Sequence, residues 1–228
     1  MNSDKFTPRL LGIAFLIQAV ASMTVGFFLA PVDMLEPSVS GNISDTMTNI
    51  ANNALRMRAS IMGEMITAIG VVLLAVLLYT TLKKQNKIIA RWAFGLRITE
   101  VALYAVRGIF IYSLLRISQE SVIAGHPAYL QTLGNLFYES QSFGYALAML
   151  VFALGATLFY YLFFKSGYIP RVLSLWGLIA APLALIGILF VLFDYNVPLL
   201  VFLPNLPFEL TMGVWLIVKG FNSSAIAS

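Results

Sequence analysis

Residues 97–107 read Arg97-Ile98-Thr99-Glu100-Val101-Ala102-Leu103-Tyr104-Ala105-Val106-Arg107, an apolar run broken by four widely spaced polar side chains. Arg97, Glu100, Tyr104 and Arg107 follow one another at intervals of three, four and three residues. Helical geometry places residues at these intervals on one face. Because ionisable side chains are costly inside a membrane, we expect this face to turn toward the interior of a helix bundle and its charges to pair there.

The composition predicts that the surroundings of this stretch are a lipid bilayer. The chain has 228 residues, of which 60% are hydrophobic and only 11% are charged, and its mean hydropathy is +0.87. Soluble domains carry about 25% charged residues and are about half apolar. Several apolar runs are long enough to cross a bilayer, so we predict a multi-pass membrane protein with one integral membrane domain over residues 1–228.

The apolar runs predict an all-α fold, a bundle of six transmembrane helices. The first run is followed by Pro31 and lacks a small-residue cleavage site, which favours a retained span over a signal peptide. The third run is longer than the hydrocarbon core, so its helix must tilt or protrude. The predicted spans cover residues 10–30, 60–82, 88–117, 133–164, 171–193 and 199–218.

A shorter amphipathic helix is predicted between the first two spans. Apolar residues from Ile43 to Ile61 recur every three or four positions, with asparagine and arginine opposite them, a pattern typical of a helix with one buried face. Ser44 or Asp45 can cap its start. We expect this helix to lie at the extracytoplasmic interface and to run into the second span.

The basic residues predict the orientation of the chain. With the amino terminus inside, nine basic residues fall on the inner side, two on the outer side and three in the third span. By the positive-inside rule, both termini are expected in the cytoplasm. The net charge of +4 therefore reflects topology, and we expect no nucleic-acid partner.

The ionisable residues within the spans predict a polar site. The number of residues from each span's outer end places Arg107 in the outer half of the membrane, together with Glu64, Glu139 and Glu209. Arg97 and Glu100 lie closer to the cytoplasmic side. We expect an outward-facing cavity in which Arg107 meets at least one of those glutamates, floored by an Arg97–Glu100 pair. The candidate ligand-binding residues are Glu64, Arg97, Glu100, Tyr104, Arg107, Glu139 and Glu209.

These charges admit other interpretations. They can be structural ion pairs that fix helix packing, and span boundaries wrong by a few residues would leave Glu64 or Glu139 at the interface. We favour a protein that binds or conducts a small molecule, ion or lipid. The alternatives are an accessory or structural protein and, third, an intramembrane enzyme with carboxylate acid and base.

Several chemistries lack their residues. The chain has no cysteine and one histidine, so the usual zinc ligand sets are impossible within one chain, while an all-carboxylate metal site remains as an alternative. His126 precedes a proline and is expected in a turn, and no GxSxG elbow is present. We predict no catalytic residue, metal or cofactor. The expected partners are the bilayer and a small-molecule or lipid ligand, and the oligomeric state is left open.

Three stretches carry a family resemblance. They are Arg97-Ile98-Thr99-Glu100, the segment 166–180 that begins Ser166-Gly167-Tyr168-Ile169-Pro170-Arg171, and the segment 207–221 that begins Pro207-Phe208-Glu209-Leu210. Together they resemble the domain-of-unknown-function 4386 family of bacterial multi-pass membrane proteins. The resemblance implies a bacterial inner-membrane protein and brings no established activity or substrate. It matches Arg97, Glu100 and Glu209 to polar positions of the family pattern without assigning them a role.

Overall fold

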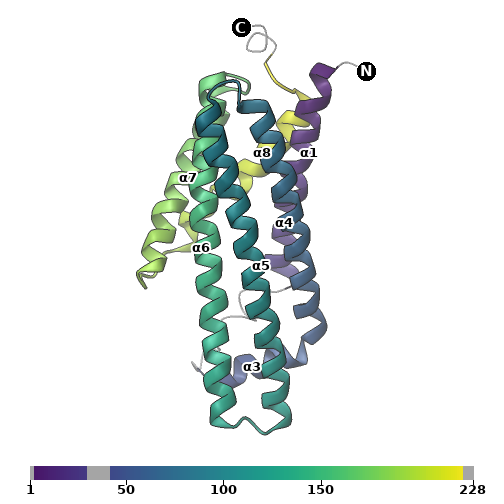
Figure 1. Cartoon of the computed structure of the whole chain (residues 1–228), viewed down its shortest axis with the longest axis vertical. Helices are drawn as coiled ribbons and strands as arrows, with labels where there is room; N and C mark the ends of the chain where they lie inside the picture. The colour runs from purple at the N-terminus through teal and green to yellow at the C-terminus, as the bar shows by residue number, and fades with distance from the viewer. Residues whose placement is uncertain (1–2, 30–41, 223–228) are drawn as a thin grey trace. The chain divides into compact units, whose positions relative to one another are not determined.

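The computed structural model describes residues 3–29 and 42–222, and within these residues it contains helices and no strand (Figure 1). The all-α prediction is therefore confirmed. The elements are α1 Ser3–Thr24, the π-helical turn η1 Val25–Leu29, α3 Ile43–Asn52, α4 Ala54–Leu82, α5 Lys87–Ile123, α6 Ala128–Ser166, α7 Arg171–Leu192, the 3₁₀ turn η2 Leu199–Val201 and α8 Asn205–Val218.

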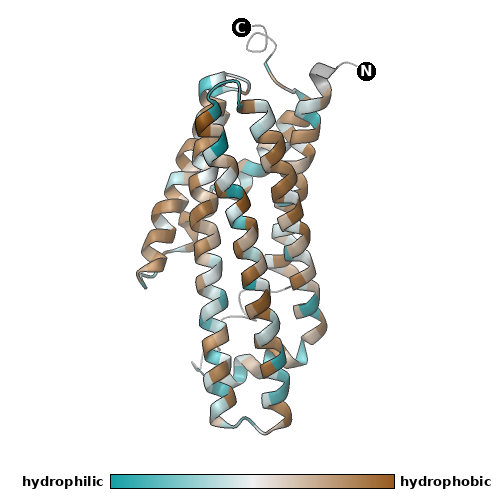
Figure 2. Ribbon diagram, viewed as in Figure 1, coloured by the Kyte–Doolittle hydropathy of each residue, from teal (hydrophilic) through white to brown (hydrophobic). Residues whose placement is uncertain are grey.

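Six segments of the described chain are long and apolar enough to cross a membrane, the number that the sequence predicts. Hydrophobic residues run along all the long helices (Figure 2). Many of them point outward, with exposed fractions of 71% for Ile69, 65% for Ile109 and 83% for Val172. Apolar surface of this extent, on helices that satisfy their own backbone hydrogen bonds, suits lipid. The protein is therefore a multi-pass membrane protein.

The helices α4, α5 and α6 are longer than the spans predicted for them. The α5 helix has 37 residues and α6 has 39, so each exceeds the roughly 30 Å hydrocarbon core at about 1.5 Å per residue. Caps and turns set these ends. The side-chain oxygen of Asn86, for example, accepts hydrogen bonds of 3.0 Å from the backbone N–H groups of Ile88 and Ile89 at the start of α5. The predicted end of the first span, Ala30, lies outside the described residues.

The amphipathic segment before the second span forms a separate helix, α3. The side chain of Asn42 caps it by accepting a 3.0 Å hydrogen bond from the backbone N–H of Ser44. The expected cap, Ser44 or Asp45, is wrong because the helix already begins at Ile43 and leaves both residues in its first turn. Asn53 separates α3 from α4. The location of α3 at a membrane interface stays a prediction.

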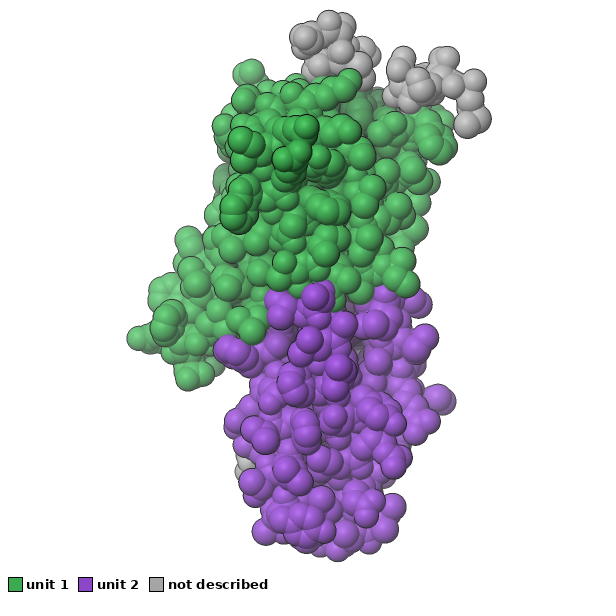
Figure 3. All heavy atoms as spheres, viewed as in Figure 1, with its two compact units in different colours: residues 1–19, 68–101, 146–228 green, residues 20–67, 102–145 purple. Residues whose placement is uncertain are grey.

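The chain divides into two compact units (Figure 3). Unit 1 comprises residues 1–19, 68–101 and 146–228, and unit 2 comprises residues 20–67 and 102–145. The division falls within α1, α4, α5 and α6, so each of these helices contributes a segment to both units. The single integral domain expected over residues 1–228 stays a prediction.

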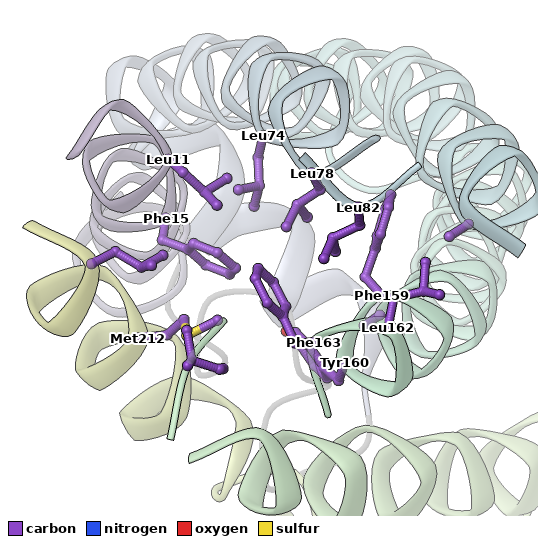
Figure 4. Packing of buried hydrophobic residues seen from close by; sticks show 14 of the residues in the cluster. Leu11, Phe15, Leu74, Leu78, Leu82, Phe159, Tyr160, Leu162, Phe163 and Met212 are labelled. Atoms are coloured by element: carbon purple, nitrogen blue, oxygen red, sulfur yellow. The ribbon is translucent and has the colours of Figure 1, made fainter. Parts of the chain in front are cut away.

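The core of unit 1 is formed by side chains of α1, α4, α5, α6, α7 and α8, and the labelled residues of α1, α4, α6 and α8 point toward one another in Figure 4. Phe208 of α8 is completely buried. Its ring meets Tyr160 edge-on at 4.7 Å and Trp176 at 5.9 Å between centroids. Gly177 of α7 makes room for this ring, since an added Cβ would lie 2.6 Å from Phe208 Cζ. Phe208 therefore holds α8 against α6 and α7.

Two glycines let α8 pack equally closely against α1. A Cβ added to Gly12 would lie 2.6 Å from the carbonyl oxygen of Gly213, and one added to Gly213 would lie 2.7 Å from Leu16. Small residues at such crossings allow helix backbones to approach within membranes. Asn205 adds a 3.1 Å hydrogen bond from its side-chain amide to the carbonyl oxygen of Ala180 in α7. Together these contacts fix how α8 is rotated.

Unit 2 has its own smaller core and a tight connection between α5 and α6. The core residues are Ile50, Met57, Ile111, Leu114 and Leu115. His126 lies in the connection with a φ of 60°, and its carbonyl oxygen accepts a 2.7 Å hydrogen bond from Gln131. These contacts agree with a structural role for this histidine.

Candidate functional site

The buried polar residues of unit 1 gather around Arg97, and we call Gln18, Arg97, Glu100 and Glu209 the Arg97 cluster. Arg97 Nη1 lies 2.9 Å from Glu100 Oε2, one helical turn further along α5. Its Nη2 donates a 2.8 Å hydrogen bond to Gln18 Oε1 of α1. The guanidinium carbon lies 4.9 Å from the centroid of the Phe152 ring, close enough for a cation–π contact.

Glu209 supplies a second carboxylate to this cluster from α8. It is attracted by Arg97 and shares a hydrogen bond with Gln18, and its negative charge acts on Glu100. Tyr160 of α6 interacts with the same three charged groups. The exposed fractions are 3% for Arg97, 1% for Glu100 and 7% for Glu209. The cluster thus holds two acidic side chains and one basic side chain away from solvent.

The close packing of α5 on α6 determines where Arg97 lies. A Cβ added to Gly155 would lie 3.2 Å from the carbonyl oxygen of Ala93 and 3.3 Å from Arg97 Cγ. This approach is tighter than ordinary van der Waals contact, and only glycine permits it without a shift of α5. The stem of Arg97 consequently runs along α6, with Phe152 beside its guanidinium.

A second set of polar residues lies in unit 2, and we call Glu64, Arg107, Gln141, Ser142 and Tyr145 the Arg107 cluster. Arg107 Nη1 donates to Glu64 Oε1 of α4. Its Nη2 donates to Gln141 Oε1 of α6 at 3.1 Å, and the Gln141 amide donates to Ser142 Oγ at 2.7 Å. The guanidinium carbon lies 4.9 Å from the centroid of the Tyr145 ring.

The Arg107–Glu64 pair is less enclosed than the Arg97–Glu100 pair. The exposed fractions of the side chains are 11% and 8% in the first pair, against 3% and 2% in the second. Within residues 3–29 and 42–222, the buried atoms Glu64 Oε2 and Arg107 Nε have no hydrogen-bond partner. The pair therefore carries one acceptor and one donor that its protein neighbours leave unused.

The seven residues expected from the sequence divide between the units. Unit 1 holds Arg97, Glu100 and Glu209, whereas Glu64, Tyr104, Arg107 and Glu139 belong to unit 2. In unit 2 Arg107 pairs with Glu64, and Tyr104 is half-buried.

Glu139 does not share the ion pair of Arg107. Its side chain is exposed and accepts a 2.7 Å hydrogen bond from Asn135 of the same helix. Because Gln141 faces Arg107, a residue two positions earlier lies roughly 200° away around α6. An exposed carboxylate also fits the interpretation that this part of α6 extends beyond the hydrocarbon core.

Two glutamines of the clusters were missing from the expected set. Gln18 is the only amide residue in the predicted span 10–30, and Gln141 stands in a polar run of the fourth span. An amide buried in hydrocarbon needs a hydrogen-bond partner much as a charge does. Treating amides and charges alike within spans would have identified both residues.

Two shallow grooves lie on unit 1, each lined by a single helix and neither by cluster residues. The first has a volume of about 380 Å³ and is lined by Arg91, Trp92, Gly95, Leu96 and Thr99 of α5. The second, of about 410 Å³, is lined by Leu210, Thr211, Val214, Trp215 and Val218 of α8 and by Lys219.

Comparison with known proteins identifies a family. The model of the family described as "Domain of unknown function (DUF4386)" matches residues 10–220. No curated protein and no solved structure matches the chain significantly. The match covers nearly the whole chain and includes every residue of both clusters. This multi-pass membrane protein therefore belongs to the DUF4386 family.

Proposed function

We propose that the protein binds a small polar ligand at the Arg107 cluster, a free molecule or a lipid headgroup. The observation that carries this proposal is the pair of unused atoms, Glu64 Oε2 and Arg107 Nε. Leaving such a buried group unpaired costs about 1–3 kcal/mol. A ligand that presents an acceptor to Arg107 and a donor to Glu64 recovers that free energy.

The charges of the cluster restrict the ligand. Glu64 and Arg107 neutralise each other, and a bare anion or cation would leave an uncompensated charge in a poorly solvated place. A neutral molecule or a zwitterion avoids this penalty. The Ser142 hydroxyl accepts from Gln141 and donates to the carbonyl oxygen of Tyr138, and Tyr145, which is 44% exposed, offers an accessible aromatic ring beside Arg107.

The proposal includes a membrane setting. The distribution of basic residues, nine against two, supports an orientation with both termini in the cytoplasm. In that orientation α3 and the connection between α5 and α6 face the extracytoplasmic side, and the ligand enters from outside. The sequence resemblance supports the cytoplasmic membrane of a bacterium as the location.

Native mass spectrometry of the protein in mild detergent tests the proposal. The wild type is compared with Glu64→Gln, which removes the carboxylate, and with Glu139→Gln, the matched control on the exposed face of α6. We expect a bound species of defined mass on the wild type and on Glu139→Gln. Glu64→Gln should lose it while keeping its helical circular-dichroism spectrum. Fragmentation of the bound species separates a lipid from a free metabolite.

Other outcomes decide against ligand binding. No adduct in any of the three proteins, together with a lower melting temperature of Glu64→Gln, would favour a structural ion pair that fixes α4 against α5. An adduct that survives equally in Glu64→Gln would place the ligand elsewhere. Conversion of the bound species during incubation would support the enzyme alternative.

A further inference from the structure

The Arg97 cluster contains one carboxylate more than it has cations to balance. Glu100 of α5 and Glu209 of α8 are acidic, and Arg97 is basic. Gln18 of α1, an amide, and Phe152 and Tyr160 of α6, both aromatic, also interact with these residues. With both carboxylates ionised, the cluster would carry a net charge of −1.

An excess charge is unfavourable at this position. Arg97, Glu100 and Glu209 are each more than nine-tenths buried, and Glu209 is near enough to Glu100 to repel it. A buried charge without a partner generally becomes neutral by gaining or losing a proton. The Arg107 cluster provides the contrast, since its single carboxylate and single guanidinium already balance.

The hydrogen bonding around Arg97 indicates that neither Glu100 nor Glu209 alone forms a complete ion pair with the guanidinium. Arg97 Nη1 and Glu100 Oε2 are 2.9 Å apart. Even so, within the described part of the chain, both of these buried atoms and Arg97 Nε lack an aligned hydrogen-bond partner. A bidentate pair would have used two parallel N–H groups. Arg97 instead interacts with Glu100, Glu209 and Gln18 together. Its single positive charge therefore balances only one of the two carboxylates.

A proton suits this place better than a metal cation. A proton forms an O–H bond with a carboxylate oxygen and needs no additional room among packed side chains. A metal cation needs several oxygen ligands around it and would stand beside the positive guanidinium of Arg97. Uptake of one proton from solvent converts one carboxylate to a carboxylic acid and changes the net charge of the cluster from −1 to zero.

We infer that the Arg97 cluster is a proton-binding site, which holds one exchangeable proton shared between Glu100 and Glu209. The inference does not depend on a ligand at the Arg107 cluster. Ionisable groups within membrane spans commonly serve as proton relays. Here the proton lies between a side chain of α8 and one of α5, so its release makes the packing of α8 depend on pH.

Infrared spectroscopy of the detergent-solubilised protein tests for the proton directly. A protonated carboxylic acid has a carbonyl stretch separate from the carboxylate bands. We expect this band in the wild type at neutral pH, shifted in D₂O and lost on alkaline titration. Glu209→Gln and Glu100→Gln should each abolish it, because each leaves one carboxylate for one guanidinium. Glu139→Gln, the exposed control, should retain it.

Thermal unfolding at different pH values gives a second readout. The folded cluster binds a proton that an exposed carboxylate would already have lost, so stability should fall as the pH rises above the range in which exposed carboxylates titrate, until the cluster releases its own proton. We expect this decline in the wild type and in Glu139→Gln, and a flat profile in Glu209→Gln. A structural ion pair predicts instead that Glu209→Gln is the less stable protein at every pH.

Two results would overturn the inference. The first is a wild-type protein without the carboxylic acid band at neutral pH, which requires no variant to fold. The second is a thermal stability at alkaline pH that sodium or potassium chloride restores and choline chloride does not. That result would mean that the cluster binds a metal cation. Loss of the native adduct in Glu64→Gln affects neither readout, so failure of the ligand proposal remains distinguishable.

Discussion

Arg97 and Arg107, ten residues apart on α5, are held by the same three kinds of partner. Each guanidinium takes a carboxylate, an amide oxygen and the face of an aromatic ring. The partners are Glu100, Gln18 and Phe152 for Arg97, and Glu64, Gln141 and Tyr145 for Arg107. A guanidinium has five N–H donors, more than one carboxylate can use, so the amides matter as much as the carboxylates here.

Replacing the amides tests this argument at the level of single residues. Gln18→Met keeps the length of the side chain but removes the acceptor 2.8 Å from Arg97 Nη2. We expect a loss of about 1–2 kcal/mol in unfolding free energy in detergent, since a buried charged donor loses its partner. Gln141→Met should cost less, because its bond to Arg107 is 3.1 Å long and that arginine is more exposed. Equal losses of unfolding free energy in the two variants, or a larger loss in Gln141→Met, would contradict this prediction.

At this scale the sequence predicts local pairs better than distant ones. Arg97 and Glu100 are three residues apart, so helical geometry alone suggested their pairing. Arg107 and Glu64 are 43 residues apart, and the sequence offered Glu64 only as one of three partners. The choice between Glu139 and Gln141 depends on how α6 is rotated, which is set by tertiary contacts such as that of Gly144 with Arg107.

Among the elements, α8 is the one whose placement most affects the polar sites. It has only 14 residues, and its neighbours hold it through close contacts at glycines: Gly177 of α7 receives Phe208, and Gly213 lies against α1. Glu209 follows Phe208 directly and precedes Gly213 by one turn. The packing that orients Phe208 and Gly213 therefore also turns Glu209 toward Arg97.

A single added methyl group tests the contact between α7 and α8. Gly177→Ala would bring its Cβ to 2.6 Å from Phe208, so the ring and α8 must shift. We expect a loss of about 1–3 kcal/mol, typical of an overpacked core. In Gly95→Ala the Cβ meets open space, so this control should be neutral or up to about 1 kcal/mol more stable. Similar melting temperatures for both variants would show that Phe208 adapts without moving α8.

The lengths of the helices show that hydropathy locates the membrane spans but does not locate the helix ends. Apolar runs located six candidate spans because burial in lipid requires them. They could not locate the helix ends, which depend on hydrogen-bonded caps such as Asn42 and Asn86. The sixth predicted span is the clearest case. Residues 199–204 do not belong to α8, so counting along a uniform helix from residue 199 misjudged the surroundings of Glu209.

At the scale of the whole molecule, each compact unit contains one buried cluster of charges among its described residues. The boundary between the units falls inside four helices, so no loop between helices marks it in the sequence. It depends on which halves of the helices pack together. The sequence consequently grouped all the charges into one site. The structure instead assigns Glu209 to unit 1 with Arg97, and Arg107 to unit 2 with Glu64.

The orientation of the molecule can be tested by cysteine labelling, since the natural chain contains no cysteine. Lys84→Cys lies in the connection before α5, and Ile123→Cys lies at the end of α5, where the side chain is 82% exposed. By the positive-inside rule, an impermeant maleimide should label Ile123→Cys in intact cells. It should label Lys84→Cys only after permeabilisation. The reverse pattern would mean that the protein has the opposite orientation in the membrane. Labelling of both variants in intact cells would mean that α5 does not cross the membrane. The expected result would put the Ile123 end of α5, which belongs to unit 2, on the side from which the ligand of the Arg107 cluster is proposed to enter.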